Sequence, residues 1–417
     1  MMENDSIKER VILAAVNISG RDMDAENSLN ELEELARTAG AECCGRLVQN
    51  AQRFNPATYL GSGKVQELRF LVEDTGATGV ICDDELSPAQ LANLEDALDT
   101  KVMDRTLLIL DIFAEHASTR EGSIQVELAQ LRYRATRLTG MRRSLSRLGG
   151  GIGTRGPGEK KLEMDRRLIR ERISRLKNDL DDVKRHRQVS RQQREKSSIP
   201  VAAIVGYTNA GKSTLLNSLT GANVLEEDML FATLDPVTRS LELEKGQEIL
   251  LTDTVGFIHK LPHHLIDAFR STLEEARYAD ILIHVVDASS PDFEMHMKVV
   301  YETLNELGAG GKKVITLFNK TDLPQSFHNA EYLHDIHAEY QLLTSIKYNK
   351  GLEELRIILS EILRADKLLI ERVFDYSHAG DIAIIRRHGQ LIEERYQEDG
   401  IYVKARVPKE IYARLTF

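Results

Sequence analysis

The sequence predicts an α/β protein made of four consecutive parts. Three observations support this: strand and helix patterns alternate near the N-terminus, two heptad repeats flank a glycine-rich loop, and a phosphate-binding loop follows a buried strand. We expect an N-terminal parallel α/β domain at 1–119, an antiparallel helical hairpin at 120–196, a P-loop α/β domain at 197–364 and a small α+β domain at 365–417.

Composition and cysteine usage exclude several classes of protein. The 417 residues are 42% hydrophobic and 29% charged, which is ordinary for a globular protein and unlike a collagen, a disulfide scaffold or a disordered chain. Cys43, Cys44 and Cys82 form no CxxC pair, so we expect three reduced thiols and no zinc site. Residues 1–10 mix acids and bases without an apolar run, so we expect no signal peptide there, and no apolar run approaches the roughly 20 residues that span a bilayer. We therefore expect a cytoplasmic protein.

Alternating apolar runs and helical patterns define the first part. Strands are expected at 11–18 and 80–82, and helices at 29–36, 65–71 and 91–98. The segment Gly61-Ser62-Gly63-Lys64 resembles a phosphate loop. It lacks both the full spacing and a preceding buried strand, so we expect a turn and a helix start rather than a second nucleotide site.

The second part is a basic island between two acidic regions. Lys and Arg outnumber Asp and Glu by 22 to 10 in 120–196, whereas they are outnumbered 10 to 22 before it and 23 to 33 after it. Apolar residues follow heptad spacing on both sides of the glycine-rich loop 149–158. They are Ile124, Leu128, Leu131, Ala135, Leu138 and Leu145 before the loop, and Leu162, Ile169, Ile173, Leu176, Leu180 and Val183 after it.

These features predict a helical hairpin whose arms reach roughly 40–50 Å. We place its arginines and lysines on the outer faces, where they could neutralise phosphates of a nucleic acid. They are Arg132, Arg134, Arg137, Arg142, Arg143 and Arg147 in the first arm, and Arg166, Arg167, Arg170, Arg172, Arg175 and Lys177 in the second. The alternative is a solvated coiled coil with a flexible turn.

A nucleotide site is predicted where the buried strand 201–205 runs into a GxxxxGK[ST] loop and a helix. The loop residues are Gly206, Tyr207, Thr208, Asn209, Ala210, Gly211, Lys212, Ser213 and Thr214. Their N–H groups would wrap the phosphates at a helix N-terminus. We expect Lys212 to reach the β- and γ-phosphates and the Ser213 hydroxyl to ligate Mg²⁺.

Two further segments complete the expected phosphate and magnesium site. The strand 249–252 ends in Asp253, Thr254, Val255 and Gly256, a DxxG element whose carboxylate would hold Mg²⁺ through water and whose glycine N–H would meet the γ-phosphate. Between the two loops lie Phe231, Ala232, Thr233, Leu234 and Asp235, which we expect to contact the nucleotide. We take Thr233 as the threonine that ligates Mg²⁺, with Thr238 as the alternative, and count Lys212, Thr233 and Gly256 as catalytic.

The base is expected to be guanine. Asn319, Lys320, Thr321 and Asp322 form an NKxD element after the strand 314–318. The Asp322 carboxylate can accept hydrogen bonds from guanine N1–H and the 2-amino group, which adenine does not offer. Ser345, Ile346 and Lys347 would close over the base, although Ile346 stands where a small alanine is usual.

Two residues of the site are unusual. Phe257 follows the DxxG glycine, where small GTPases place a water-orienting glutamine, so intrinsic turnover should be slow unless a partner completes the site. The alternative is that Phe257 is a core residue and the enzyme is inert. We also hypothesise that the Asn209 amide oxygen helps to hold a K⁺ ion near the β/γ bridge.

The motifs together resemble the HflX family of translation-associated GTPases of the TRAFAC class. GYTNAGKSTLLN at 206–217, FATLDP at 231–236, DTVGFI at 253–258 and NKTD at 319–322 match the class. NPATYLGSGKVQEL at 55–68, the block at 104–133 and RLGGGIGTRGPGEKKLEMDRR at 147–167 narrow it to that family. The resemblance implies a GTP- and GDP-binding monomer that binds the 50S subunit and its 23S rRNA through the hairpin. It also implies splitting or rescue of stalled 70S ribosomes under stress.

Other functions remain open at this point. One is an ATP-dependent RNA-remodelling protein, since family members are reported to use ATP through the N-terminal domain. Another is a GTP-controlled RNA clamp with negligible hydrolysis. In the tail from 366, we expect a helix at 381–387 and paired strands at 391–396 and 401–407, which form a separate α+β domain. A contact of this domain with a ribosomal protein is a further hypothesis that these patterns do not establish.

Overall fold

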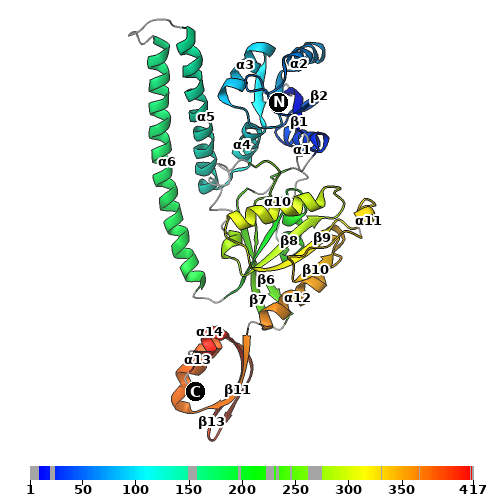
Figure 1. Cartoon of the computed structure of the whole chain (residues 1–417). Helices are drawn as coiled ribbons and strands as arrows, with labels where there is room; N and C mark the ends of the chain where they lie inside the picture. The colour runs from blue at the N-terminus through cyan, green and yellow to red at the C-terminus, as the bar shows by residue number, and fades with distance from the viewer. Residues whose placement is uncertain are drawn as a thin grey trace, which may run out of the picture.

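The computed structural model describes residues 9–18, 24–148, 157–195, 199–221, 230–231, 234–244, 247–261, 275–329, 331–365, 367–413 and 415. Within them the chain forms a four-stranded, a six-stranded and a three-stranded sheet, and a long pair of helices (Figure 1). This mixed α/β architecture is the one expected from the sequence. None of the described helices is long and apolar enough to cross a membrane.

The N-terminal domain is a parallel sheet with helices on both faces. Its strands are β1 (Arg10–Ile18), β2 (Glu42–Ala51), β3 (Gly79–Cys82) and β4 (Lys101–Asp104), in the order β2-β1-β3-β4. Its helices are α1 (Ala25–Thr38), α2 (Ser62–Thr75), α3 (Pro88–Leu98) and α4 (Arg105–His116).

The buried strand β1 contributes side chains to the core on both faces of the N-terminal sheet. Val11, Leu13 and Ala15 pack with α1 and α4, whereas the alternate residues Ile12 and Ala14 pack with α2 and α3. Because both faces are covered, β1 is apolar without a polar-apolar alternation. The first face also joins the core of the nucleotide domain in one continuous cluster.

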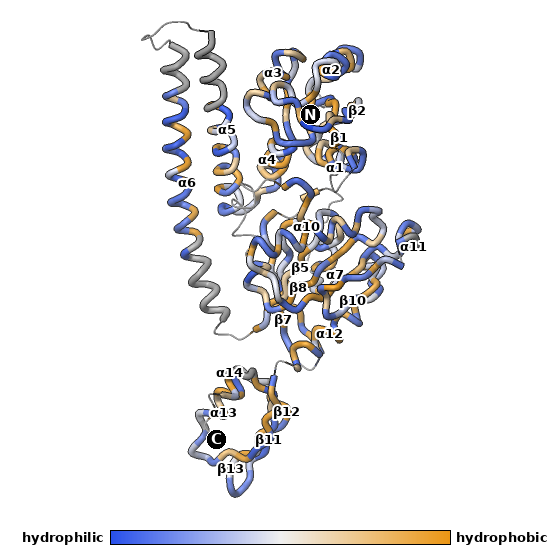
Figure 2. The backbone as a smooth tube through the Cα atoms, in the orientation of Figure 1, coloured by the Kyte–Doolittle hydropathy of each residue, from blue (hydrophilic) through white to orange (hydrophobic). Residues whose placement is uncertain are grey.

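The hairpin has the predicted antiparallel form. Helices α5 (Arg120–Leu148) and α6 (Pro157–Glu195) lie side by side (Figure 1), and Figure 2 shows hydrophilic and hydrophobic residues alternating along the coloured middle part of α6. The seam that joins them is confirmed along its described core, which consists of Ile124, Leu128, Leu176 and Leu180 with Leu131 and Ile173 against them. The glycine-rich loop lies outside the described residues from 149 to 156.

A second face of α5 packs on the N-terminal domain, which the heptad pattern did not predict. Val126, Ala129 and Tyr133 belong to the core that contains α1 and α4. Arg137 is correspondingly not an outer-face arginine, because its guanidinium donates to the Asp104 carboxylate at 2.6 Å. The prediction that all the hairpin cations face outward is therefore wrong at this residue, and the base of α5 is fixed to the N-terminal sheet.

The nucleotide domain has a six-stranded sheet in the order β10-β9-β8-β5-β7-β6. The strands are β5 (Val201–Gly206), β6 (Val237–Leu243), β7 (Gln247–Asp253), β8 (Ile281–Asp287), β9 (Lys313–Asn319) and β10 (Tyr340–Leu343), and only β6 runs antiparallel to its neighbour. Helices α7 (Lys212–Thr220) and α12 (Leu352–Ala365) cover one face, and α10 (Phe293–Glu306) covers the face that meets the N-terminal domain.

The C-terminal domain is a small α+β unit at the end of α12, at the opposite end of the molecule from the N-terminal domain (Figure 1). The expected helix is α13 (Ala379–His388), and the expected strand pair is β12 (Gln390–Gln397) with β13 (Gly400–Pro408). A third strand, β11 (Lys367–Phe374), was not predicted and pairs antiparallel with β13. Ile385, Val403 and Ala405 are fully buried in the core of this domain.

We predict that Asp104→Ala loosens the base of the hairpin. The buried Asp104 carboxylate accepts hydrogen bonds from Arg137, from the Tyr133 hydroxyl at 2.6 Å and from the Leu107 N–H that begins α4. Removing it leaves a half-buried guanidinium without its counter-charge, so the free energy of unfolding should fall by about 3–5 kcal/mol in urea denaturation. The exposed Asp96→Ala is the matched control, and equal denaturation midpoints for the two variants would contradict the prediction.

Candidate nucleotide site and its contacts with the N-terminal domain

The two glycines of the P-loop are required by what lies next to them. Gly206 ends β5 at φ 154°, and a Cβ there would lie 2.3 Å from the Val285 carbonyl oxygen on β8. Gly211 precedes α7 at φ 103°, and a Cβ there would lie 2.5 Å from the Asn319 amide nitrogen. The loop therefore packs closely against β8 and against the end of β9. This packing fixes the curvature that a loop needs to wrap its N–H groups around a phosphate.

Asn319 joins the P-loop to the loop expected to cover the base. Its amide donates to the Ala210 carbonyl at 2.9 Å and accepts from the Ile346 N–H at 3.0 Å. The Ser345 hydroxyl donates to the Asp322 carboxylate at 2.5 Å. The structure therefore brings together three segments that are far apart in sequence, and the buried Ile346 packs beneath Gly211 rather than disturbing the loop.

The rest of the NKxD element is held by contacts with the end of β8 and with the segment that follows β10. Lys320 adopts φ 63° and its ammonium pairs with Asp287 at the end of β8, at 2.7 Å. The Thr321 hydroxyl donates to the Thr344 carbonyl at 2.8 Å. Lys347 is exposed in a short 3-10 turn, Ile346–Tyr348. Asp322 is thus presented at the carboxyl edge of the sheet, where open α/β sheets bind ligands.

The residues expected to hold phosphate and Mg²⁺ lie close together. The Ser213 hydroxyl donates to the Asp253 carboxylate at 2.7 Å, and the Lys212 ammonium donates to the Tyr207 carbonyl at 2.7 Å. Thr254 is buried and its hydroxyl donates to the Ile204 carbonyl, which fixes the DxxG loop to β5. Burial lowers the pKa of Lys212 to about 8, although the Asp253 carboxylate acts in the opposite direction.

The segment 253–260, which we call switch II, lies directly on the P-loop. The Thr208 N–H donates to the Phe257 carbonyl at 2.8 Å, and the Phe257 N–H donates to the Gly206 carbonyl at 3.2 Å. A Cβ on Gly256 would lie 2.8 Å from Thr208 Cα and 3.1 Å from Lys212 Nζ. Gly256 therefore lies next to the Lys212 ammonium, and a glycine at this position leaves room for the Thr208 backbone.

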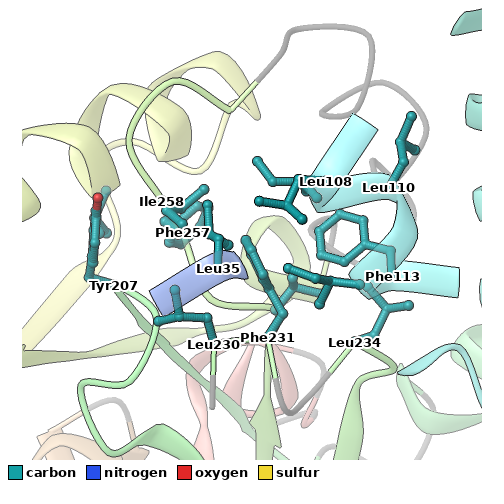
Figure 3. Packing of buried hydrophobic residues seen from close by; sticks show 14 of the residues in the cluster. Leu35, Leu108, Leu110, Phe113, Tyr207, Leu230, Phe231, Leu234, Phe257 and Ile258 are labelled. Carbon is teal, nitrogen blue, oxygen red and sulfur yellow. The ribbon is translucent and has the colours of Figure 1, made fainter. Parts of the chain in front are cut away.

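Phe257 belongs to the core between the domains. Its ring is 1% exposed and lies near Ile258 and Leu35 of α1 (Figure 3). This position agrees with the alternative interpretation of Phe257 as a core residue, because its side chain is used for packing. The same packing fixes switch II to the N-terminal domain.

The segment 230–235, which we call switch I, also contacts the N-terminal domain. Phe231 adopts φ 60°, packs edge-on against Phe113 of α4 with ring centroids 4.7 Å apart (Figure 3), and donates its N–H to the Thr208 hydroxyl. Ala232 and Thr233 lie outside the described residues. Thr238, the alternative magnesium ligand, lies in β6 with its hydroxyl 2.9 Å from that of Thr252.

Asp235, which the sequence analysis placed among the nucleotide contacts, is directed elsewhere. Its carboxylate accepts hydrogen bonds from Ser118 and Thr119, immediately before α5. Leu234 is buried in the same core as Phe231. The four switch I residues that the structure describes, Leu230, Phe231, Leu234 and Asp235, therefore all lie in the domain interface.

A buried ion network connects switch II with the N-terminal sheet. Arg105 is 1% exposed, pairs with Glu31 of α1 and with Asp83 at 2.6 Å, and donates to the His259 carbonyl at 3.3 Å. Lys260 pairs in turn with Asp83 and with Asp84, the latter at 3.0 Å. Two cations from different domains thus share one cluster of carboxylates at the carboxyl ends of the N-terminal strands.

The P-loop takes part in this network through Tyr207. The Tyr207 hydroxyl donates to Glu31 and accepts from the His259 N–H at 2.7 Å, and its ring stacks on His296 of α10 at 3.8 Å. Burial and the neighbouring Glu31 raise the pKa of Tyr207 far above its usual range. The position that the sequence analysis assigned to nucleotide contact therefore bonds through its side chain to the N-terminal domain.

The charges of the network are fixed by one another. Burial would raise the pKa of Asp83, but Arg105 and Lys260 outweigh it and hold that pKa well below its usual range. Burial also lowers the pKa of His259 to about 4, with Arg105 and Lys260 acting in the same direction. Near neutral pH the network therefore holds an ionised Asp83 next to a neutral His259.

Sequence reasoning did not identify this network. Arg105, Glu31 and Asp83 come from three separate elements, and the only local signal was a charged Asp-Asp pair directly after a buried strand. The GSGK segment behaves as expected, because Gly61 precedes α2 and the Lys64 ammonium pairs with Glu67 at 2.8 Å. Within the described residues, no group of three or more His, Cys, Asp or Glu could hold a metal ion.

The pKa of Lys212 predicts a pH-dependent affinity for nucleotide. Its folded-state value of about 8 lies below the ordinary 10.5, so the amine loses its proton above pH 8, whereas a bound phosphate favours the charged form. GTP binding at pH 9 should therefore take up about one proton, and affinity should fall up to about tenfold per pH unit between pH 8 and 10. Calorimetry in two buffers of different ionisation enthalpy measures this uptake. Lys212→Arg keeps its charge and should show none; equal uptake in both proteins would exclude Lys212 as the source.

Comparison with known protein families agrees with this architecture. Residues 26–114 match a family described as GTP-binding GTPase N-terminal, and residues 116–194 match one described as GTP-binding GTPase Middle Region. Residues 201–320 match a family described as 50S ribosome-binding GTPase. A solved structure of the protein SsGBP with GDP is similar at 25% identity and a TM-score of 0.47, and covers 85% of this chain and 98% of its own.

Three relatives that align over most of their length are each named GTPase HflX. GTPase HflX of Lacrimispora saccharolytica is 62% identical over 415 residues, which cover 100% of this chain and 97% of that protein. GTPase HflX of Caldanaerobacter subterraneus subsp. tengcongensis is 51% identical over 98% of this chain and 93% of its own length. GTPase HflX of Escherichia coli is 41% identical over 88% and 85%. On these matches, together with its P-loop domain, the chain belongs to the HflX family of GTPases.

Proposed function

We propose that this GTPase binds the 50S ribosomal subunit through its hairpin and splits or rescues stalled 70S ribosomes under stress, with hydrolysis stimulated by the ribosome. The observation that carries the proposal is a basic hairpin whose base is fixed to the domain that contacts both switches. The match of 201–320 to a ribosome-binding GTPase family supports the same partner. The protein would act as a monomer in the cytoplasm.

In the proposed reaction, the P-loop N–H groups of 206–214 and the Lys212 ammonium hold the phosphates of GTP. Mg²⁺ would be held by the Ser213 hydroxyl and Thr233, with Asp253 acting through water; the 2.7 Å contact between Ser213 and Asp253 places a hydroxyl and a carboxylate together, which fits a hard cation. That ion neutralises the charge that develops on the phosphate oxygens. Asp322 would select guanine, with the loop 345–347 over the base.

The position of Phe257 supports stimulation by the ribosome. An aromatic ring cannot orient water by a hydrogen bond, and this ring is used in the core. Gly256 lies next to the Lys212 ammonium, where its N–H would meet a γ-phosphate. A partner that orders switch II around the attacking water would therefore supply what Phe257 cannot, and would raise the rate by electrostatic preorganisation.

The rRNA contact is assigned to arginines that the hairpin leaves exposed. Arg134 on α5 and Arg170 and Arg175 on α6 are exposed, unlike Arg137. Other cations of the hairpin are partly neutralised within it, as where Arg172 pairs with Glu127 at 2.7 Å. The remaining exposed cations can meet phosphates of 23S rRNA along one rod.

Two other functions give different results in the same assays. An ATP-dependent RNA-remodelling protein would hydrolyse ATP, and the helix-start role of Gly61–Lys64 gives that function no support. A passive GTP-controlled clamp would bind RNA with negligible hydrolysis and would still bind after Lys212→Ala. Turnover of GTP against ATP, with and without 50S subunits, separates these possibilities.

The central prediction concerns the exposed arginines. Changing Arg134, Arg170 and Arg175 together to Gln should abolish 50S stimulation of GTP hydrolysis and lower the salt dependence of 50S binding. Each lost phosphate contact should reduce the slope of log affinity against log salt by roughly 0.7–0.9. Stimulated GTPase rates and sedimentation with 50S subunits over a salt series measure both effects.

A matched variant removes three exposed arginines outside the hairpin, Arg53, Arg69 and Arg239, and should retain stimulation and slope. A second variant with a shortened 149–158 loop tests whether the tip is needed for stimulation. Wild-type protein that 50S subunits do not stimulate would refute ribosome gating, and loss of 50S binding in both arginine variants would refute assignment to the hairpin.

The proposed K⁺ ion has its own prediction. Asn209 is exposed at the tip of the P-loop with φ 56°, which suits an amide that reaches toward a bound nucleotide. GTP hydrolysis should be on the order of tenfold or more faster in K⁺ than in Na⁺, because the cation takes the place of an arginine finger. Asn209→Ala should remove the difference, and equal turnover of the wild type in the two salts would exclude the idea.

A further inference from the structure

Asp235 makes an unusual contact for a residue of switch I. Its carboxylate is 9% exposed and accepts four hydrogen bonds from the two residues that precede the hairpin. One oxygen accepts from the Ser118 N–H at 3.1 Å, the Ser118 hydroxyl at 2.9 Å and the Thr119 N–H at 2.8 Å, and the other accepts from the Thr119 hydroxyl. A carboxylate of the nucleotide domain thus holds the start of the hairpin, more than 100 residues away in sequence.

The first turn of α5 is shaped to admit this carboxylate. Thr119 begins the helix, since its hydroxyl accepts from the Gly122 N–H at 3.0 Å and its carbonyl accepts from the Ser123 N–H. A Cβ on Gly122 would lie 2.5 Å from the Asp235 carboxylate oxygen. Glycine is therefore the residue that leaves room for Asp235, and the negative charge lies at the helix end that favours it.

The contact lies at the bend between α4 and α5, residues 117–119, which we call the elbow. Helix α4 ends at His116 and α5 begins at Arg120, so three residues link the N-terminal domain to the hairpin, and the contacts of Asp104 are the next attachment along α5. Asp235 bonds two of those three. Because the hairpin reaches roughly 40 Å from this point, a rotation of ten degrees at the elbow moves its tip by about 7 Å.

The other end of switch I is attached to the P-loop. The Phe231 N–H donates to the Thr208 hydroxyl at 3.1 Å, and Thr208 itself is bonded to the Phe257 carbonyl. Thr233, the proposed magnesium ligand, precedes Asp235 by two residues, a span of at most about 7 Å. A displacement of Thr233 by several ångströms therefore pulls on the Asp235 carboxylate.

We propose that Asp235 is a positioning residue that transmits the nucleotide state to the elbow and so directs the hairpin. The arrangement described here has the Asp235 carboxylate on the elbow. In this proposal GDP keeps the carboxylate there, whereas GTP draws switch I toward Mg²⁺ and withdraws it. By reciprocity, a hairpin held by its partner changes the affinity of the site for GTP. This proposal deepens the proposed function and rests on it for the identity of the partner.

Amide hydrogen exchange of the full-length protein tests the proposal without a ribosome. In the wild type, the amides of 118–123 should exchange about fivefold or more faster with a non-hydrolysable GTP analogue than with GDP, the scale set by loss of a helix cap. Asp235→Ala should give the fast rate in both states. Asp235→Asn keeps an acceptor oxygen and should restore the difference between nucleotides, which a merely structural role would not predict.

A second variant approaches the contact from the other side. Gly122→Ala leaves Asp235 in place but fills its space, so it should also give the fast rate with both nucleotides. Glu242→Ala, an exposed carboxylate on β6, is the matched control and should behave as the wild type. Equal exchange of wild type with the two nucleotides, or a nucleotide-dependent difference that survives in both Asp235→Ala and Gly122→Ala, would overturn the proposal.

The role of the ribosome is tested in a separate experiment. Stimulation of GTP hydrolysis by 50S subunits should be lost in Asp235→Ala and retained in Asp235→Asn. If 50S subunits fail to bind the wild type while the exchange difference is present, the proposed partner is wrong and the coupling stands. If they bind and stimulate while the exchange difference is absent, the coupling is wrong and the proposed function stands.

Discussion

The ion network around Arg105 is the interaction on which the arrangement of this molecule depends. A fully buried guanidinium from the first residue of α4 joins α1, the end of β3 and the backbone of switch II. Removing one member would leave a buried charge without its partner, which typically costs about 3–5 kcal/mol. Docking of the two domains and the position of switch II are therefore determined together, and neither can change freely without the other.

The location of the network explains its form. In open parallel sheets the carboxyl ends of the strands are where ligands bind, because loops and helix ends gather there. In the N-terminal domain that edge carries Asp83, Asp84 and Asp104, and it receives Lys260 of switch II together with Arg137 of the hairpin. The N-terminal sheet thus uses its ligand-binding edge to hold the two neighbouring parts of its own chain. The nucleotide site lies at the equivalent edge of the second sheet, so the two edges face each other across switch II.

This arrangement gives the hairpin two attachments of different kinds. At Asp104 it is fixed to the N-terminal sheet by buried hydrogen bonds that involve Tyr133 and Arg137. At the elbow it is held by Asp235, which belongs to a segment that nucleotide rearranges in this class of enzyme. One attachment keeps the rod on its domain, and the other depends on the state of the site. Because the helix pair is long, a small rotation at its base produces a large displacement of its tip.

Much of the site could be predicted because its signals are local in sequence. The phosphate loop, the DxxG and NKxD elements and the heptad seam each place their residues within one strand, loop or helix. Their spacing is therefore fixed by backbone geometry, and the structure brings Asn319, Ala210 and Ile346 together as parallel strand ends require. The same local rules identified β12 and β13 but not β11, whose partner strand follows it by more than 25 residues.

The sequence by itself determined the fold class, the phosphate loop, the NKxD element and the existence of a basic hairpin, since each follows from periodicity or from a motif within a single segment. Only the tertiary structure decided where Phe257, Tyr207 and Asp235 direct their side chains, and that Arg137 faces inward. The hydrogen-bond partners of Arg137, Asp235 and Tyr207 lie 33 to 176 positions away, and the energy of burying a charge is set by those partners rather than by neighbours in sequence. The motifs of the site can therefore be identified within short segments of sequence. The contacts that couple the site to the rest of the chain form only when the domains pack.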